Sequence, residues 1–312
     1  MFFKKELPLF VSEKDGFFLV TKGGGIMRLL AKLLLFVGVL GLVFVLVMRN
    51  VNFSIYFDQI GKEPTVDTKE MYIDTLRQAM LKRDPVVNLD FKGNSEEVHG
   101  FVSDAINHVF EVDDPSTNVD YDYLKYCYKS TEITIKGLFN SYQIEYKISY
   151  NETKKETDKV LSKVRKTLQT MNVSEMDDYH KIKSVHDYII NNAAYDLTGV
   201  NNSAYENLIG KKSVCQGYAA VTYLMMKEAG IDCRIITGTG KGVGHAWNIV
   251  KLNNKWYNID CTWDDPVSKD GKQYLEYDYF LKSNADFINH IRDFEFESEL
   301  FHNKYKMADI SY

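Results

Sequence analysis

Cys215, His245 and Asp260 are the residues of this 312-residue chain whose types and order could perform acyl transfer. A thiol attacks an acyl carbon only as the thiolate, and an imidazole beside it both generates and stabilises that thiolate. A carboxylate on the far nitrogen of the ring fixes the tautomer and the orientation of the imidazole. The three residues therefore predict a thiol enzyme, provided that the fold brings them together.

Cys215 begins a predicted helix that ends near Gly230. The helix dipole and the unpaired backbone N–H groups of the first turn favour a thiolate at this position. The N–H groups of Cys215 and Gln216 are also candidates to bind an oxyanion, because backbone N–H groups in the first turn of a helix have no intrahelical acceptor. Helix-start placement therefore suits a nucleophile.

His245 and Asp260 lie on two predicted strands on either side of Asn253-Asn254, a pair able to occupy left-handed turn positions. A two-residue turn places Trp247 opposite Asp260, so the side chain of His245 projects from the same face as its diagonal neighbour. Such neighbours lie roughly 7–8 Å apart at the backbone, within reach of an imidazole–carboxylate hydrogen bond. An odd-numbered loop without a bulge would put the two side chains on opposite faces.

Each of these residues has a commoner structural role when taken alone, since a lone buried cysteine is usually packing. Their joint placement favours catalysis. The glycine-spaced run before His245 could suggest a phosphate loop, but the strand–loop–helix context and the Lys-Ser/Thr ending are missing. Ser174 is expected to cap a helix from Glu175 to Asn192. His186 and Asp187 are adjacent on this helix and cannot face each other, so both are expected on the helix surface.

Three blocks of sequence carry a family resemblance. They read Gly210-(x)₄-Cys215-Gln-Gly-Tyr, His245-Ala-Trp-Asn and Trp256-Tyr-Asn-Ile-Asp260-x-Thr-Trp-Asp-Asp, and Tyr188-Ile-Ile-Asn-Asn-(x)₂-Tyr195-Asp precedes them. Together they resemble bacterial members of the transglutaminase-like superfamily, within the papain-like cysteine enzymes. The resemblance implies Cys215 as nucleophile, His245 as general base and acid, and Asp260 as the residue that orients the histidine. It also implies an α+β fold in which the nucleophilic helix packs on an antiparallel sheet.

The expected chemistry is attack on the amide bond of a peptide or protein, with a thioester intermediate. Water as the second nucleophile makes a peptidase or amidase, and a lysine amine makes a transglutaminase-type crosslinker. Four aromatic residues and one amide are the substrate-binding candidates: Tyr195, Tyr218, Trp247, Trp263 and Gln216. The alternative is a noncatalytic surface module that retains the fold to bind peptides. The sequence has neither a calcium-loop pattern nor a Cys-x-x-Cys pair, so no metal and no cofactor are expected.

The N-terminal part predicts a membrane anchor. Residues 33–48 are uncharged and apolar, and the run extends back to Leu29 if Lys32 reaches the interface, which gives about 20 residues for a bilayer core of roughly 30 Å. Most of the positive charge precedes this run, so the N-terminus is expected in the cytoplasm and the rest outside. A cleaved signal peptide is the rival, although the apolar run is long and no Ala-x-Ala-like site follows it.

The predicted organisation is a cytoplasmic tail (1–28), a single transmembrane helix (29–49), a stalk (50–65), an N-terminal α+β region (66–150) and a transglutaminase-like catalytic domain (151–312). Residues 1–49 carry a net charge of +4, which leaves −9 for the remainder of a chain whose total is −5. An acidic external part excludes nucleic acid as a partner and favours peptide or protein substrates, such as cell-wall peptides. The four cysteines are too few for a disulfide framework.

Overall fold

The computed structural model describes residues 68–138, 140–267 and 274–312. The predicted cytoplasmic tail, transmembrane helix and stalk lie outside these residues. Within the described part of the chain, no helix is both long enough and apolar enough to cross a bilayer.

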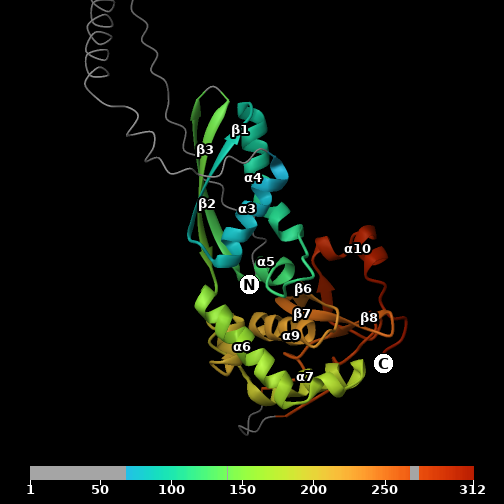
Figure 1. Ribbon diagram of the computed structural model, residues 1–312. Coiled ribbons are helices and arrows are strands. Elements are labelled where there is room, and N and C mark those ends of the chain that lie inside the picture. The colour runs from blue at the N-terminus through green and yellow to red at the C-terminus, as the bar shows by residue number, and fades with distance from the viewer. Residues whose placement is uncertain (1–67, 139, 268–273) are drawn as a thin grey trace, which may run out of the picture.

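The first part of the fold packs helices on a three-stranded antiparallel sheet (Figure 1). Its elements are α3 (Lys69–Lys82), β1 (Val86–Lys92), α4 (Ser95–Glu111), α5 (Tyr121–Cys127), β2 (Tyr128–Leu138) and β3 (Ser141–Tyr150), with strand order β1-β3-β2. The apolar stripe of α4 that contains Val98 and Val102 packs with Ile144 and Tyr146 of β3 in one core. Strands β2 and β3 form an antiparallel hairpin, and the short helix α5 leads into it.

The second part holds a four-stranded antiparallel sheet with the order β8-β7-β6-β9. Its elements are α6 (Lys154–Thr170), η1 (Val173–Glu175), α7 (Asp178–Asn192), β4 (Ala194–Tyr195), α8 (Ala204–Leu208), β5 (Lys212–Ser213), α9 (Cys215–Glu228), β6 (Cys233–Gly240), β7 (Val243–Leu252), β8 (Lys255–Ile259), β9 (His290–Arg292), η2 (Phe294–Phe296) and α10 (Glu299–Lys304). Helix α9 lies on β6 and β7, with α6 and α7 on its other side (Figure 1). A mixed α+β fold with the cysteine-bearing helix on an antiparallel sheet is therefore confirmed.

Helix starts differ from the sequence expectation in one place that matters for the site. Ser174 was expected to cap the helix before the nucleophile, but it lies inside the short turn η1. Met176 is extended, so α7 begins at Asp178, three residues later than expected, and the Asp177 side chain accepts from the backbone N–H of His180. His186 lies in the third turn of α7, on the side that faces the core.

Helix α5 contributes to the cores of both parts. Leu124 belongs to the core under the three-stranded sheet, whereas Tyr123 and Cys127 belong to the core that surrounds α9. The same seven-residue helix thus places one face against each part of the molecule.

Candidate active site

Cys215 is the first residue of α9, and the start of this helix lacks a side-chain cap. The N-cap is Val214, which has no acceptor, whereas the side chains of Thr153, Asp177 and Ser203 cap α6, α7 and α8. The N–H groups of Cys215 and Gln216 therefore meet no capping side chain and remain available to an oxyanion. Cys215 is 4% exposed, and its Sγ lies 3.6 Å from Oε1 of Gln216.

The β7–β8 hairpin has the register that the two-residue turn predicts. Leu252 pairs with Lys255, and both turn residues are left-handed, with φ of 50° at Asn253 and 62° at Asn254. His245 and Asp260 consequently share a face, and Nε2 of His245 lies 2.6 Å from Oδ2 of Asp260. The geometric part of the prediction is confirmed.

The electrostatics of this pair favour a charged imidazole. Burial alone lowers the pKa of His245, but the charge and hydrogen bond of Asp260, together with Cys215, raise it to about 10. Burial alone raises the pKa of Asp260, but His245 and His290 hold it well below its usual range. Because Nε2 of His245 contacts Asp260, Nδ1 is the ring nitrogen that remains for the Cys215 thiol.

The Asp260 carboxylate accepts hydrogen bonds at both oxygens. Oδ1 accepts from the backbone N–H groups of Thr262 at 2.9 Å and Trp263 at 3.2 Å. Oδ2 accepts from His245 and also from Nε2 of His290 at 3.1 Å. The ligand atoms of His245, Asp260 and His290 lie within 4.8 Å of one another, a spacing that a metal ion could bridge. The two short contacts to Oδ2 already satisfy that oxygen, so we interpret the cluster as a hydrogen-bonded network.

Trp263 lies beside the histidine. Its ring centroid is 5.2 Å from that of His245, its side chain is partly exposed, and the Lys241 ammonium lies 4.6 Å from its ring. Gly240 explains how the two rings can lie so close to β6. A Cβ at this position would meet Trp263 at 2.7 Å and His245 at 3.1 Å.

The remaining substrate-binding candidates divide by exposure. Tyr195 and Gln216 are partly exposed, and burial together with the nearby Cys215 raises the pKa of Tyr195. Tyr218 and Trp247 are each 1% exposed, so neither offers a surface to a substrate in this structure. Tyr218 donates to Asp265, and Trp247 stacks on His245 at 6.0 Å. Both support the site from within the core.

The expectation that His186 lies on the helix surface and cannot face Asp187 is wrong in both parts. Its side chain is fully buried, with Nε2 3.0 Å from Oδ2 of Asp264 and Nδ1 3.1 Å from Oδ1 of Asp187. Asp264 in turn accepts from the backbone N–H of Tyr279 and donates its own N–H to the carbonyl of Asp260. Through Asp264, His186 therefore stabilises the turn that follows Asp260. The spacing from Ile182 and Ile189 would have placed it on the apolar stripe, had the stripe been extended to include a histidine.

The other three cysteines are free and buried in surroundings that disfavour a thiolate. Burial raises the pKa of Cys127 to about 12 and the pKa values of Cys233 and Cys261 further. None of these three residues begins a helix. Cys215 is the cysteine that lies beside an imidazole.

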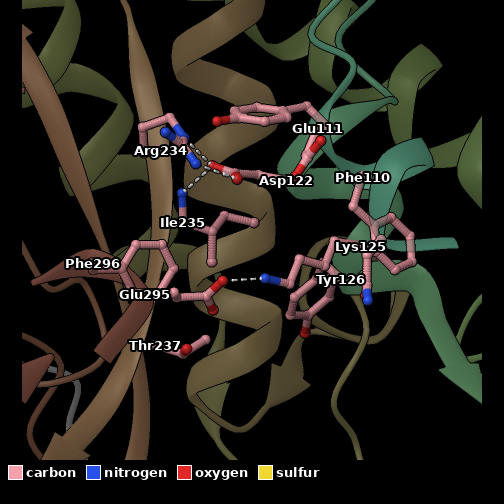
Figure 2. Close-up of a pocket in the computed structure, with 12 residues that line it drawn as sticks. Phe110, Glu111, Asp122, Lys125, Tyr126, Arg234, Ile235, Thr237, Glu295 and Phe296 are labelled. Atoms are coloured by element: carbon pink, nitrogen blue, oxygen red, sulfur yellow. Dashed lines mark hydrogen bonds and ion pairs between the residues drawn. The ribbon is translucent and has the colours of Figure 1, made fainter. Parts of the chain in front are cut away.

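A cavity of about 420 Å³ opens between α5 and β6 (Figure 2). Ile235 and Thr237 of β6 face Lys125 and Tyr126 of α5, and the Lys125 ammonium binds Glu295 at 2.6 Å across the opening. None of the triad residues is among the described residues that line it. In its lining, the Tyr126 hydroxyl donates to the carbonyl of Asn202, in the loop before α8.

The segment that carries the site resembles a known protein family. Residues 165–261, which include Cys215, His245 and Asp260, match the family described as the transglutaminase-like superfamily, so this segment is a transglutaminase-like domain. The kyphoscoliosis peptidases of Homo sapiens and Mus musculus are each 30% identical to the chain in a match that covers 36% of this chain and 20% of each relative. The chain thus matches about a fifth of the length of these curated relatives. A crystal structure of a TGase gives a TM-score of 0.33 at 13% identity, covering 65% of this chain and 59% of that chain.

Proposed function

We propose that this chain, with its transglutaminase-like domain, is a thiol enzyme that cleaves amide bonds of peptides or proteins through Cys215, His245 and Asp260. The observation that carries the proposal is the 2.6 Å contact between His245 Nε2 and Asp260 Oδ2, on the sheet that packs against the helix begun by Cys215. The name peptidase, which both curated relatives bear, supports hydrolysis as the outcome.

The first half of the reaction forms a thioester. His245 takes the proton of the Cys215 thiol at Nδ1, and Sγ attacks the carbonyl carbon of the amide. The carbonyl oxygen becomes an oxyanion that the N–H groups of Cys215 and Gln216 receive. The C–N bond then breaks while His245 returns its proton to the departing nitrogen.

The second half releases the acyl group. His245 removes a proton from the entering water, whose oxygen attacks the thioester carbon. The carbon–sulfur bond breaks, and the thiolate regains its proton from His245 as the carboxylic acid leaves. A lysine amine in place of water would form an isopeptide bond by the same steps, and the access of water to the thioester decides between them.

The assay that tests this function offers the purified full chain a glutamine-containing peptide with and without a labelled amine. Hydrolysis alone is expected, detected as the free acid by mass spectrometry. Incorporation of the amine would make the chain a transferase. Failure of Cys215 to form any acyl adduct, with peptide binding retained, would make the domain the noncatalytic peptide-binding module.

We also propose that residues 29–49 anchor the enzyme in a cell membrane with the catalytic part outside. Support comes from the sequence, where an uncharged run of 16 residues follows a basic segment. Surface peptides, including those of the cell wall, are then the accessible substrates. Protease added to intact cells should degrade the catalytic part and spare the N-terminal tail, and full protection of the catalytic part would reverse this topology.

A further inference from the structure

His290 brings a second imidazole to the carboxylate that serves the triad. Its Nε2 lies 3.1 Å from Asp260 Oδ2, the same oxygen that accepts from His245 at 2.6 Å. The side chain of His290 is 1% exposed, like that of Asp260. No step of the proposed mechanism uses this histidine.

The orientation of the His290 ring is fixed from several sides. Its Nδ1 lies 3.2 Å from the carbonyl oxygen of Ile288, so both ring nitrogens face acceptors. The ring stacks on Phe287 with centroids 3.9 Å apart and lies 4.3 Å from Trp263. Residue 290 also pairs with Gly240 at the edge of the sheet. A residue held so firmly is suited to hold its hydrogen-bond partner in place.

We propose that His290 is a positioning residue, which fixes the Asp260 carboxylate by donating to Oδ2 and thereby limits how strongly Asp260 retains the proton of His245. The proposal rests on the proposed function, since it assigns a role relative to the catalytic histidine. The polar contact of His290 within the site is with Asp260, so we assign it a role that acts through Asp260.

The physical reason for this role is that His245 and His290 both donate to one oxygen, Oδ2 of Asp260. Each donor withdraws charge from Oδ2, so the carboxylate attracts the proton on His245 less when His290 is present. A histidine that holds its proton too strongly is a poor acid toward the departing amine, because the best catalytic acid has a pKa near the working pH. The His245–Asp260 pair has other charged or titratable neighbours besides Cys215 and His290: Tyr195, Lys241, Cys261, Asp264 and Tyr279. Substitution of His290 leaves all of these side chains in place.

The test compares His290→Gln with His290→Leu in the full chain, with thermal unfolding as the check that both variants fold. In the Cys215→Ala background, NMR follows the titration of the His245 imidazole and needs no turnover. We expect the His245 midpoint to rise by roughly one pH unit in His290→Leu and by less in His290→Gln, whose amide N–H can still donate to Oδ2.

In the chain with Cys215 intact, His290→Leu should lower kcat roughly tenfold with little change in KM, and His290→Gln should recover part of the loss. An unchanged or lowered His245 midpoint in folded His290→Leu would overturn the proposal and leave His290 as packing. Inhibition by Zn²⁺ alone that His290→Leu abolishes would also overturn it, in favour of a metal-binding cluster. A raised midpoint in a chain that turns over no amide would uphold the role of His290 while the proposed function fails.

Discussion

Asp122 of α5 holds Arg234 of β6 in a two-pronged ion pair, with Nε 2.7 Å from Oδ2 and Nη2 2.9 Å from Oδ1. The pair lies in the wall of the cavity between α5 and β6 (Figure 2), and Oδ2 also accepts from the backbone N–H of Ile235 at 2.8 Å. The guanidinium lies over the rings of Tyr121 at 4.3 Å and Tyr305 at 4.7 Å. One carboxylate of the N-terminal part thus fixes the strand whose other end lies beside His245.

Arg234→Met is expected to destabilise the chain by about 3–5 kcal/mol, because it leaves the Asp122 carboxylate buried without its cation. Denaturant unfolding measures the loss. Lys125→Met is the matched control, since Lys125 also joins α5 to the second part through Glu295 but both side chains are about half exposed, at 47% and 49%. The control should cost about 1 kcal/mol or less. Equal costs in the two variants would contradict a special role for the buried pair.

Cys215→Ala and His245→Ala should each lower kcat about 10⁶-fold, and the double variant should lose little more, because residues that act as one unit are not additive. Asp260→Ala should cost less, about 10⁴-fold, since the imidazole remains but is misoriented. Single-turnover kinetics on the proposed peptide substrate measures all four variants. Losses that multiply in the double variant would show that Cys215 and His245 act independently.

Limited iodoacetamide should modify Cys215 first. All four cysteines are buried to a similar degree, from 1% to 4% exposed, so exposure alone does not distinguish them. Cys215 begins a helix and lies beside the His245 imidazole, whereas burial raises the pKa values of Cys127, Cys233 and Cys261. Mass-spectrometric mapping over time gives the order of labelling. The control is His99→Ala, because His99 is exposed on α4. Loss of the selectivity in His245→Ala but not in His99→Ala would show that the imidazole beside Cys215 causes it.

His186→Gln should destabilise the chain more at pH 6 than at pH 9. Burial lowers the pKa of His186, but Asp187 and Asp264 together raise it above 6.5, the value of an unperturbed histidine. A pKa raised in the folded state adds stability that is complete below the unfolded value and is lost as the pH rises through the folded value. Denaturant unfolding at both pH values measures the penalty.

The control for this prediction is His180→Gln on the same helix, where the histidine side chain is 63% exposed. Its penalty should be small, because an exposed ion pair contributes about 1 kcal/mol or less. A penalty of His186→Gln that grows toward alkaline pH would mean that the buried ring is neutral in the folded chain.

The sequence by itself determined the relation between His245 and Asp260. Two residues separate the strands, and Asn253-Asn254 adopt the left-handed conformation that such a turn requires. The turn sets the register of β7 and β8. Because side chains alternate along each strand, this register places His245 and Asp260 on one face of the sheet. The position of Cys215 at the start of a helix was likewise readable from its neighbours.

Only the tertiary structure decided which residues surround that pair. His290 reaches Asp260 because β9 returns to the edge of β6 across the intervening residues, and no spacing along the chain encodes that return. His186 meets Asp264 across 78 positions because α7 packs beside α9. The local spacing could place the ring on the buried face of α7, but it could not name the partner. Asp122 meets Arg234 across 112 positions. Contacts of this kind depend on how whole elements pack, and the periodicity of one element does not contain them.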